Sequence, residues 1–334
     1  MLRVTGLLLL PALAASAATN LAPAISLLLD DSTALQITAG LKQYNSPPRF
    51  AGKVTIVGGG TSSIHINRWT AEFATLFPDV DLDTHGGGSA AGLNGLIEGK
   101  VDIVHMNRPL ATNEVAGFKA KFGYEPAQIV VAQGAEGVYV NKNNPISGLT
   151  LAQLDSIYSR DAKRGGGRPE LWSDLGITGP LASEPIIRVS LSQVHSSYVF
   201  FQDTVMQGAD YRFDVRFESV PTSLVQAVGA NDAAIGFASV ALATARTRFV
   251  PIQARDGRFL VPSFENTSTG QYPLVRFVRI VFNRKPGGTM NRAAREFLRF
   301  AVSRRGQRII ARAGSYPISL EQQDEALRRI GEGP

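Results

Sequence analysis

Cysteine is absent from all 334 residues of the chain. This absence excludes a disulfide framework, a cysteine-ligated metal site and a lipid-modified cysteine near the N-terminus. Long apolar runs are also missing, because the stretch from Val4 to Ala14 is shorter than the roughly 20 residues that a membrane-spanning helix needs. The chain further lacks a G-x-S-x-G elbow, a complete P-loop and an H-E-x-x-H pair. These absences favour a binding protein without a cofactor over an enzyme.

The N-terminus has the parts of a secretory signal peptide. Arg3 precedes the short apolar stretch, and Ala15-Ser16-Ala17 follows it as a cleavage site. We therefore expect residues 1–17 to be a signal peptide and the mature chain to be free in the periplasm, without a lipid anchor. An uncleaved anchor or a first core helix remain as alternatives.

The charge balance is basic, with a net charge of +6 and an isoelectric point near 9.6. The excess is concentrated in the arginines between Arg292 and Arg312 and in the glycine-rich loop Lys163–Arg168. No nucleic-acid-binding motif accompanies them, so we expect no nucleic-acid partner. The arginines are interpreted as solvated helix faces or, alternatively, as a docking surface for an acidic partner. The excess also favours anionic ligands over cationic ones.

Three turns of glycine and small hydroxyl residues are the most informative local feature. They are Gly58–Ser63, Gly86–Ser89 and Val194–Ser197, and each opens onto a helical pattern. Glycine lets the backbone approach a ligand closely, and the following helix N-terminus offers free N–H groups and the positive end of its dipole. The turns therefore predict a site that surrounds a small anion. They are also compatible with ordinary turns of an α/β domain.

From Lys53 onward, strand-like and helix-like segments alternate, which predicts an α/β fold with parallel strands. A helix from about Thr61 places four large apolar residues on one stripe, and a capping box predicts another helix from Thr150. The stripe consists of Ile66, Trp69, Phe73 and Phe77. The apolar segments Ile129–Val140 and Ala233–Phe237 are predicted to cross between two lobes. The first lobe would then be built from both ends of the mature chain.

These crossings set the expected domain boundaries, and the roughly 317 residues that remain after cleavage are enough for two domains. Residues 18–52 show no clean period and are predicted to be a leader or linker. The remaining expected segments are 53–132 for the first part of lobe I, 133–237 for lobe II and 238–334 for the second part of lobe I.

The order of the motifs resembles the periplasmic phosphate-binding proteins of ABC transporters, which have the type 2 periplasmic binding protein fold. The matching segments run through almost the whole chain after its N-terminal part. They are Gly58 to Thr61, Trp69, Phe73, Gly88 to Gly92, Gly99 to Ile103, Asn107 to Leu110, Glu114, Val140 to Pro145, Leu149-Thr150, Trp172 to Gly176, Ile235 to Phe237, and Phe297-Leu298 to Tyr316-Pro317.

The resemblance implies two α/β lobes joined by two crossover strands, with phosphate or a related oxyanion in the cleft between them. It further implies a monomeric solute-binding protein that delivers its ligand to an ABC permease of the inner membrane. Carried over by position, the expected ligand-binding residues are Gly60, Thr61, Ser62, Ser89, Asn107, Arg108, His195, Ser196 and Ser197.

The sequence departs from the family pattern on the second lobe. The family expects a Ser-Gly-Thr turn preceded by an arginine, whereas this chain has His195-Ser196-Ser197, with Leu191 at the arginine position and Arg188 three residues too early. The departure removes a bidentate charge clamp. Alternative functions are therefore a binder of a different organic ligand or a non-transport periplasmic accessory protein. A hydrolase that uses these serines with a neighbouring histidine is a weaker alternative.

All four histidines lie within a few residues of the proposed ligand loops. They are His65, His85, His105 and His195. Three interpretations are open. The histidines pack as structural residues, or they ligate a metal, or His195 donates to the anion in place of the missing arginine. In the last case, protonation would strengthen binding at lower pH.

Overall fold

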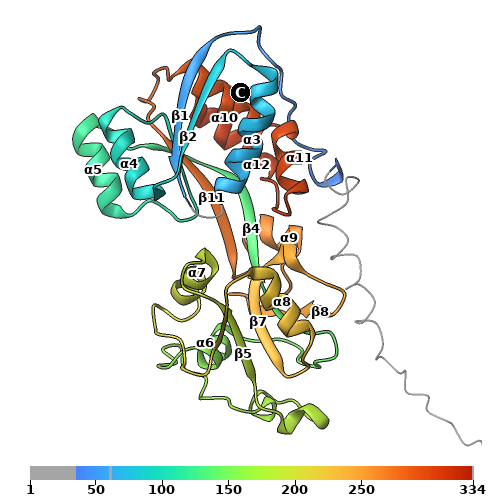
Figure 1. Ribbon diagram of the computed structural model, residues 1–334. Helices are drawn as coiled ribbons and strands as arrows, with labels where there is room; N and C mark the ends of the chain where they lie inside the picture. Colours follow the sequence, from blue (N-terminus) through green and yellow to red (C-terminus); the bar gives the residue numbers. More distant parts are fainter. Residues whose placement is uncertain (1–34, 60–61, 333–334) are drawn as a thin grey trace, which may run out of the picture.

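A computed structural model describes residues 35–59 and 62–332. The chain forms two lobes, drawn one above the other in Figure 1 and joined by strands that run from one lobe into the other. The strand order is β2-β1-β3-β11-β4-β7-β5-β6, with β8 paired to β4 off this path. The mixed α/β fold predicted from the sequence is confirmed.

The first lobe contains a sheet whose strands are mostly parallel. β1 pairs in parallel with β2 and β3, whereas β11 is antiparallel to β3 and to the first half of β4. The strands are β1 (Gly52–Gly58), β2 (Val80–His85), β3 (Ile103–Met106), β4 (Ala127–Asn141) and β11 (Val275–Phe282).

Helices cover both faces of this sheet and supply its core. The helices are α3 (Ser62–Leu76), α4 (Gly88–Glu98), α5 (Thr112–Phe122), α10 (Arg292–Val302), α11 (Arg304–Arg312) and α12 (Leu320–Ile330). The predicted stripe of α3 is confirmed, since Trp69 and Phe73 are fully buried and Phe73 packs edge-on against Phe297 of α10. A smaller core lies between α4, α5 and β3, with Phe118 at its centre.

The second lobe is built around the second half of β4. β7 pairs antiparallel with β4 and in parallel with β5, so β5 and β7 run against the direction of β4. The other elements are β5 (Ile187–Leu191), β6 (Arg216–Glu218), β7 (Ala234–Ser239), β8 (Thr247–Phe249), β9 (Ile252–Gln253), β10 (Phe259–Leu260), α6 (Leu151–Tyr158), α7 (Ser196–Thr204), α8 (Pro221–Gly229), α9 (Phe264–Ser268) and the 3-10 helices η1 (Trp172–Leu175), η2 (Pro180–Ser183) and η3 (Val240–Leu242).

Large aromatic side chains fill the core of the second lobe. Phe201 of α7 stacks on Phe237 of β7 with ring centroids 3.7 Å apart, and the ring of Tyr158 meets both edge-on. The predicted capping box of α6 is confirmed, because the side chains of Thr150 and Gln153 each accept a backbone N–H of the other residue.

Two adjacent strands connect the lobes. β4 pairs with β11 over residues 127–135 and with β7 over residues 136–140, so one continuous strand belongs to both sheets. The second connection is β11, which is preceded by the second-lobe core residue Leu274. The prediction that Ala233–Phe237 crosses between the lobes is wrong, since this segment forms β7 inside the second lobe. A buried internal strand and a crossing strand have the same apolar pattern, so periodicity does not distinguish them.

The expected boundaries shift accordingly. Residues 238–274 were expected in the first lobe, but their apolar side chains, among them Phe249 and Tyr272, pack in the core of the second lobe. The expected leader 18–52 is also shorter than predicted, because Phe50 belongs to the core of the first lobe and Leu41 is buried. The expected signal peptide lies outside the described residues.

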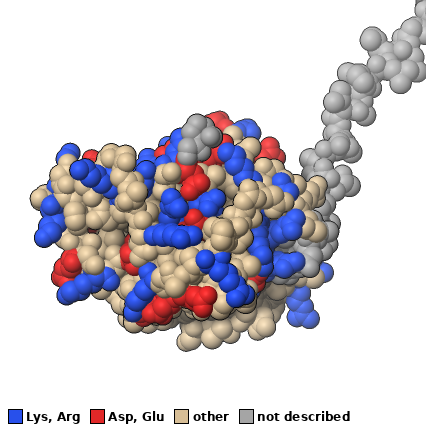
Figure 2. Space-filling model, turned by 90° about the horizontal axis from the view of Figure 1, so that it is seen from above, with Lys and Arg blue, Asp and Glu red and all other residues tan. Residues whose placement is uncertain are grey.

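The C-terminal arginines have specific structural partners. Arg305 pairs with Glu72 of α3, and Arg304 donates to the backbone carbonyl of Leu41, which ties the N-terminal segment to α11. Seen from above, acidic side chains are interspersed among the basic ones (Figure 2), so the arginines do not form one continuous basic field on this face. Among the described residues, no helix is long and apolar enough to span a bilayer.

Candidate functional site

Strand directions place the predicted loops of the two lobes opposite each other. The parallel strands β1 and β3 run from the first lobe toward the second, and β5 runs the other way. Their carboxyl ends therefore meet at the cleft, which is where open α/β sheets bind ligands. The residues that follow these ends include Asn107 after β3 and the α7 N-terminus after β5.

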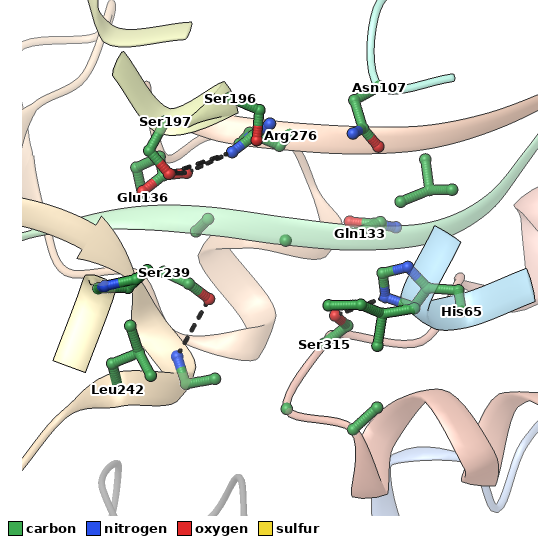
Figure 3. Close-up of a pocket in the computed structure, with 18 of the residues that line it drawn as sticks. His65, Asn107, Gln133, Glu136, Ser196, Ser197, Ser239, Leu242, Arg276 and Ser315 are labelled. Carbon is green, nitrogen blue, oxygen red and sulfur yellow. Dashed lines mark hydrogen bonds and ion pairs between the residues drawn. The ribbon is translucent and has the colours of Figure 1, made fainter. Parts of the chain in front are cut away.

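An inner hollow of about 310 Å³ lies between the lobes. Its polar lining comes from both of them, with Asn107 and His65 from the first lobe, Ser196 and Ser197 from the second, and Gln133 from the connecting strand β4. Figure 3 shows Asn107 and Ser196 on the β11 side of this hollow. The hollow therefore brings together amide and hydroxyl donors from both lobes.

A buried ion pair closes one side of the inner hollow. Arg276 of β11 lies 2.5 Å from Glu136 of β4, measured from Nη1 to Oε1, and the Ser197 hydroxyl donates to the same carboxylate oxygen over 2.8 Å (Figure 3). Glu136 is only 1% exposed and Arg276 only 12%. A buried carboxylate without a counter-charge would repel an anion in the cleft. Arg276 neutralises Glu136, and its guanidinium also faces the cleft.

An outer hollow of about 540 Å³ adjoins the inner one and shares Asn107, Ser196 and Arg276 with it. Ser89 and Arg108 also line the outer hollow. The Arg108 guanidinium donates two hydrogen bonds, of 2.6 and 2.7 Å, to the Glu114 carboxylate, and its Nη2 lies 3.3 Å from the Ser89 hydroxyl. These bonds hold the pKa of the Glu114 carboxyl below its usual value. Six of the nine predicted residues thus line the two hollows: Asn107, His195, Ser196 and Ser197 line the inner one, and Ser89 and Arg108, with Asn107 and Ser196, line the outer one.

The first glycine turn is held by a buried histidine. Gly60 and Thr61 lie outside the described residues, and the Ser62 side chain is fully buried. The Ser62 hydroxyl donates to Gly59 O over 2.8 Å and lies 2.7 Å from Nδ1 of His105. Burial lowers the pKa of His105 to about 4, so its ring is neutral at physiological pH. The Ser62 hydroxyl therefore fixes the turn, and we assign it no direct ligand contact.

The remaining histidines have separate partners. His65 shares a hydrogen bond of 2.7 Å with Ser315, and His195 Nε2 donates to Ser219 O over 2.8 Å. Both histidines line the inner hollow, whereas His85 pairs with an aspartate of its own strand. No three acidic or histidine side chains come together as a metal site in the part of the chain that the structure describes.

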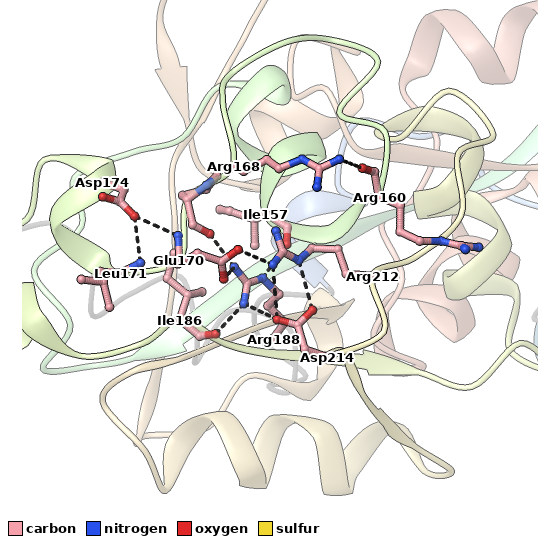
Figure 4. Close-up of polar contacts among 11 residues, drawn as sticks. Ile157, Arg160, Arg168, Glu170, Leu171, Asp174, Ile186, Arg188, Arg212 and Asp214 are labelled. Atoms are coloured by element: carbon pink, nitrogen blue, oxygen red, sulfur yellow. Dashed lines mark hydrogen bonds and ion pairs between the residues drawn. The ribbon is translucent and has the colours of Figure 1, made fainter.

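The absent arginine of the second lobe is not supplied by Arg188. Leu191 is buried, and Arg188 is turned away into a network with Glu170, Asp214 and Arg212 (Figure 4). Within this network Arg188 also donates to three backbone carbonyls. Its role is to join the loops after α6 to β5.

Sequence reasoning missed two arginines of the cleft, Arg276 and Arg279, both on β11. A signal was present, because Val275–Phe282 is an apolar strand pattern interrupted by these two charged residues, which are rarely buried without a reason. Both arginines are far along the chain from the predicted ligand loops, so the sequence did not indicate that they line the same cleft.

Comparison with known proteins identifies the architecture. Residues 42–305 match the PBP superfamily domain. Phosphate-binding protein PstS of Pseudomonas aeruginosa is 28% identical over 302 residues, which cover 90% of this chain and 94% of that protein.

Solved structures agree with this assignment. A possible phosphate binding protein from Planctomyces limnophilus aligns with a TM-score of 0.65 at 22% identity, over 85% of this chain and 99% of that one. An ABC-type phosphate transport receptor from Vibrio cholerae aligns with the same TM-score of 0.65 at 20% identity, over 79% and 99%. These likenesses establish the two-lobed fold. The chain therefore belongs to the PBP superfamily, the superfamily of the periplasmic binding proteins that its motifs resemble.

Proposed function

We propose that this protein captures phosphate or a related oxyanion between its lobes for uptake by an ABC transporter. The observation that carries the proposal is the place of Arg276. Arg276 lines both hollows, together with Asn107 from the first lobe and Ser196 from the second. A cation held between polar donors of two lobes suits a small, highly charged anion. Arg276 thus fills the role for which the family pattern expects an arginine on β5.

The names of similar proteins support this ligand class. The Pseudomonas aeruginosa relative is named for phosphate binding, and the Vibrio cholerae structure is described as an ABC-type phosphate transport receptor. By analogy we propose an inner-membrane ABC permease as the partner, and a ligand-binding rather than catalytic role. We further propose that the protein is a monomer, that residues 1–17 are a cleaved signal peptide and that the mature chain works in the periplasm.

The proposed contacts come from the expected residues together with Arg276. Asn107 and Ser196 donate from the walls of the inner hollow, and Ser89 and Arg108 donate from the outer one. Ser197 contributes its backbone N–H, because its hydroxyl already donates to Glu136. Gly60 and Thr61 remain proposed backbone and hydroxyl donors at the start of α3. His195 remains a proposed contact through Nδ1, because its Nε2 already donates to Ser219.

Isothermal titration calorimetry of the purified chain with phosphate, sulfate and molybdate tests this function. We expect a single site for phosphate or another of these oxyanions. Ser196→Ala removes a neutral donor and should weaken binding severalfold, since such a bond contributes about 0.5–1.5 kcal/mol. The double variant Arg276→Met/Glu136→Gln removes the charge without leaving an unpaired carboxylate, and should weaken binding at least about tenfold.

Arg258→Met is the matched control, because Arg258 pairs with Asp256 on an exposed part of the second lobe. It should bind with unchanged affinity. Absence of heat and of any thermal shift with all three oxyanions would reject the proposed ligand class. Unchanged affinity in the double variant would reject the role of Arg276.

A further inference from the structure

Three arginines line the outer hollow, and one of them differs from the others in its charge balance. Arg108 is paired with Glu114, and Arg276 is paired with Glu136. Arg279 has no carboxylate within ion-pair distance among residues 35–59 and 62–332. It lies on β11 beside Met106 of β3, the residue that precedes the loop carrying Asn107.

The surroundings of Arg279 make the lack of a paired carboxylate unfavourable in free energy. Its side chain is partly buried, its Nη1 donates to Phe277 O over 3.3 Å, and its guanidinium lies 5.1 Å from the centroid of the Phe277 ring. Burial lowers the pKa of Arg279, although a guanidinium stays protonated at neutral pH. A partly desolvated cation without a counter-charge gains stability when an anion enters the hollow.

The other charged group in the lining is Asp203 of α7. In its described part, the lining of the outer hollow thus holds three arginines and one aspartate. Glu114 compensates Arg108, and Glu136, which itself lines the inner hollow, compensates Arg276. The charge that remains for a ligand is therefore that of Arg279, opposed by Asp203.

The two hollows are neighbours with polar residues in common. They share Asn107, Ser196 and Arg276, and their volumes of about 310 and 540 Å³ together exceed the need of one tetrahedral oxyanion. An anion in the inner hollow and a second anionic group in the outer one would both contact the shared residues. One ligand with two linked anionic groups fits this arrangement.

We propose that the cleft accepts a condensed phosphate of the pyrophosphate type, with one phosphoryl group in the inner hollow and the second against Arg279 and Arg108. This inference rests on the proposed oxyanion function and extends it to a class of larger, two-headed anions. Arg279 is its specificity-determining residue. The affinity for a single tetrahedral oxyanion held at Ser196 and Arg276 would not depend on Arg279.

The test is a pair of calorimetric titrations, with pyrophosphate and with orthophosphate, on the wild-type protein and four variants, together with a titration of the wild type with phenyl phosphate. Wild type should bind pyrophosphate at least as tightly as orthophosphate. Arg279→Gln should lose about tenfold or more in pyrophosphate affinity and less than about twofold in orthophosphate affinity. Arg279→Lys keeps the charge and should recover part of the loss, and Asp203→Asn should raise pyrophosphate affinity by removing a like charge. Arg258→Gln is the control and should change neither titration.

The outcomes separate this inference from the proposed function. Orthophosphate binding with pyrophosphate affinity that is unaffected by Arg279→Gln and Asp203→Asn would overturn the inference and leave the proposed function standing. Tighter binding of phenyl phosphate than of pyrophosphate would also overturn it, because the outer hollow would then hold an apolar substituent. If neither phosphate binds, the inference is overturned, and the proposed function is rejected as well if sulfate and molybdate also give no heat. If Arg279→Gln does not fold, the other two variants test the inference. Relative to wild type, pyrophosphate affinity should fall in Arg279→Lys and rise in Asp203→Asn.

Discussion

At the scale of single residues, the site depends on a charge pair that is drawn from two strands. Glu136 is buried on β4, and its Oε1 accepts hydrogen bonds from Arg276 and from the Ser197 hydroxyl. Removing one partner of such a pair leaves a buried charge without compensation, whereas removing both removes the penalty as well. The pair therefore couples cleft electrostatics to the stability of the junction between the lobes.

Arg276→Met should lower the free energy of unfolding by about 3 kcal/mol, because Glu136 then stays buried and unpaired. Urea denaturation followed by circular dichroism measures this loss. The double variant Arg276→Met/Glu136→Gln should be clearly more stable than Arg276→Met alone. Equal stability of the two variants would show that leaving the Glu136 carboxylate unpaired has no cost in folding free energy.

The buried histidine gives a pH-dependent stability. The pKa of His105 is lowered from 6.5 to about 4 in the folded protein, so the folded state binds fewer protons than the unfolded state between these pH values. The free energy of unfolding should therefore fall by about 3 kcal/mol as pH drops from 6.5 to 4, and this contribution is fully present above pH 6.5.

Denaturation curves of wild type and His105→Gln across this range isolate that contribution from the carboxylates. The variant should show the shallower pH dependence. Parallel curves for wild type and His105→Gln would contradict the assignment.

At this scale, the sequence indicated which residues follow the carboxyl ends of strands, but it did not indicate which charged groups pair. Asn107, Ser196 and Ser197 line the inner hollow because they follow the carboxyl ends of parallel strands, and that rule can be applied to a sequence. Arg276 could not be placed, because its partner Glu136 is 140 positions away and only the folded sheet brings them together.

At the scale of elements, the turn from β1 into α3 is set by close packing. A Cβ atom on Gly58 would lie 2.3 Å from the backbone oxygen of His105 and 2.5 Å from its ring. Glycine is therefore required for β1 and β3 to lie side by side at the point where the first ligand loop begins.

Gly58→Ala should destabilise the protein by about 1–3 kcal/mol, the usual cost of overpacking, and should also weaken ligand binding by displacing the turn. Thermal denaturation and calorimetry measure the two effects. Gly117→Ala is the control, because nothing lies within 4 Å of its added Cβ in the middle of α5. The control should be neutral or stabilising by about 0.5–1 kcal/mol.

Elements with strong local signals were predicted well from the sequence. The apolar stripe of α3 and the capping box of α6 are local patterns, and both elements form as expected. The role of β7 was not predictable, because an apolar strand has the same composition whether it crosses between lobes or stays within one. The last helix, α12, was missed since its buried face includes polar Gln323, which donates to backbone carbonyls of the N-terminal segment and α10.

At the scale of the whole molecule, two cores are connected by β4 and β11, and the hollows lie beside these strands. A ligand that contacts both walls gains affinity when the lobes approach each other. Small-angle scattering should therefore show a smaller radius of gyration with saturating ligand than without it. An unchanged radius with a ligand whose binding has been verified would contradict lobe closure.

The most direct measurement for the whole account is a crystal structure of the protein grown with phosphate. One anion should lie between the lobes, with Arg276 and donors from both lobes, Asn107 and Ser196 among them, within hydrogen-bond distance of its oxygens. An anion bound to one lobe alone, or bound outside the cleft while the cleft stays empty, would contradict it.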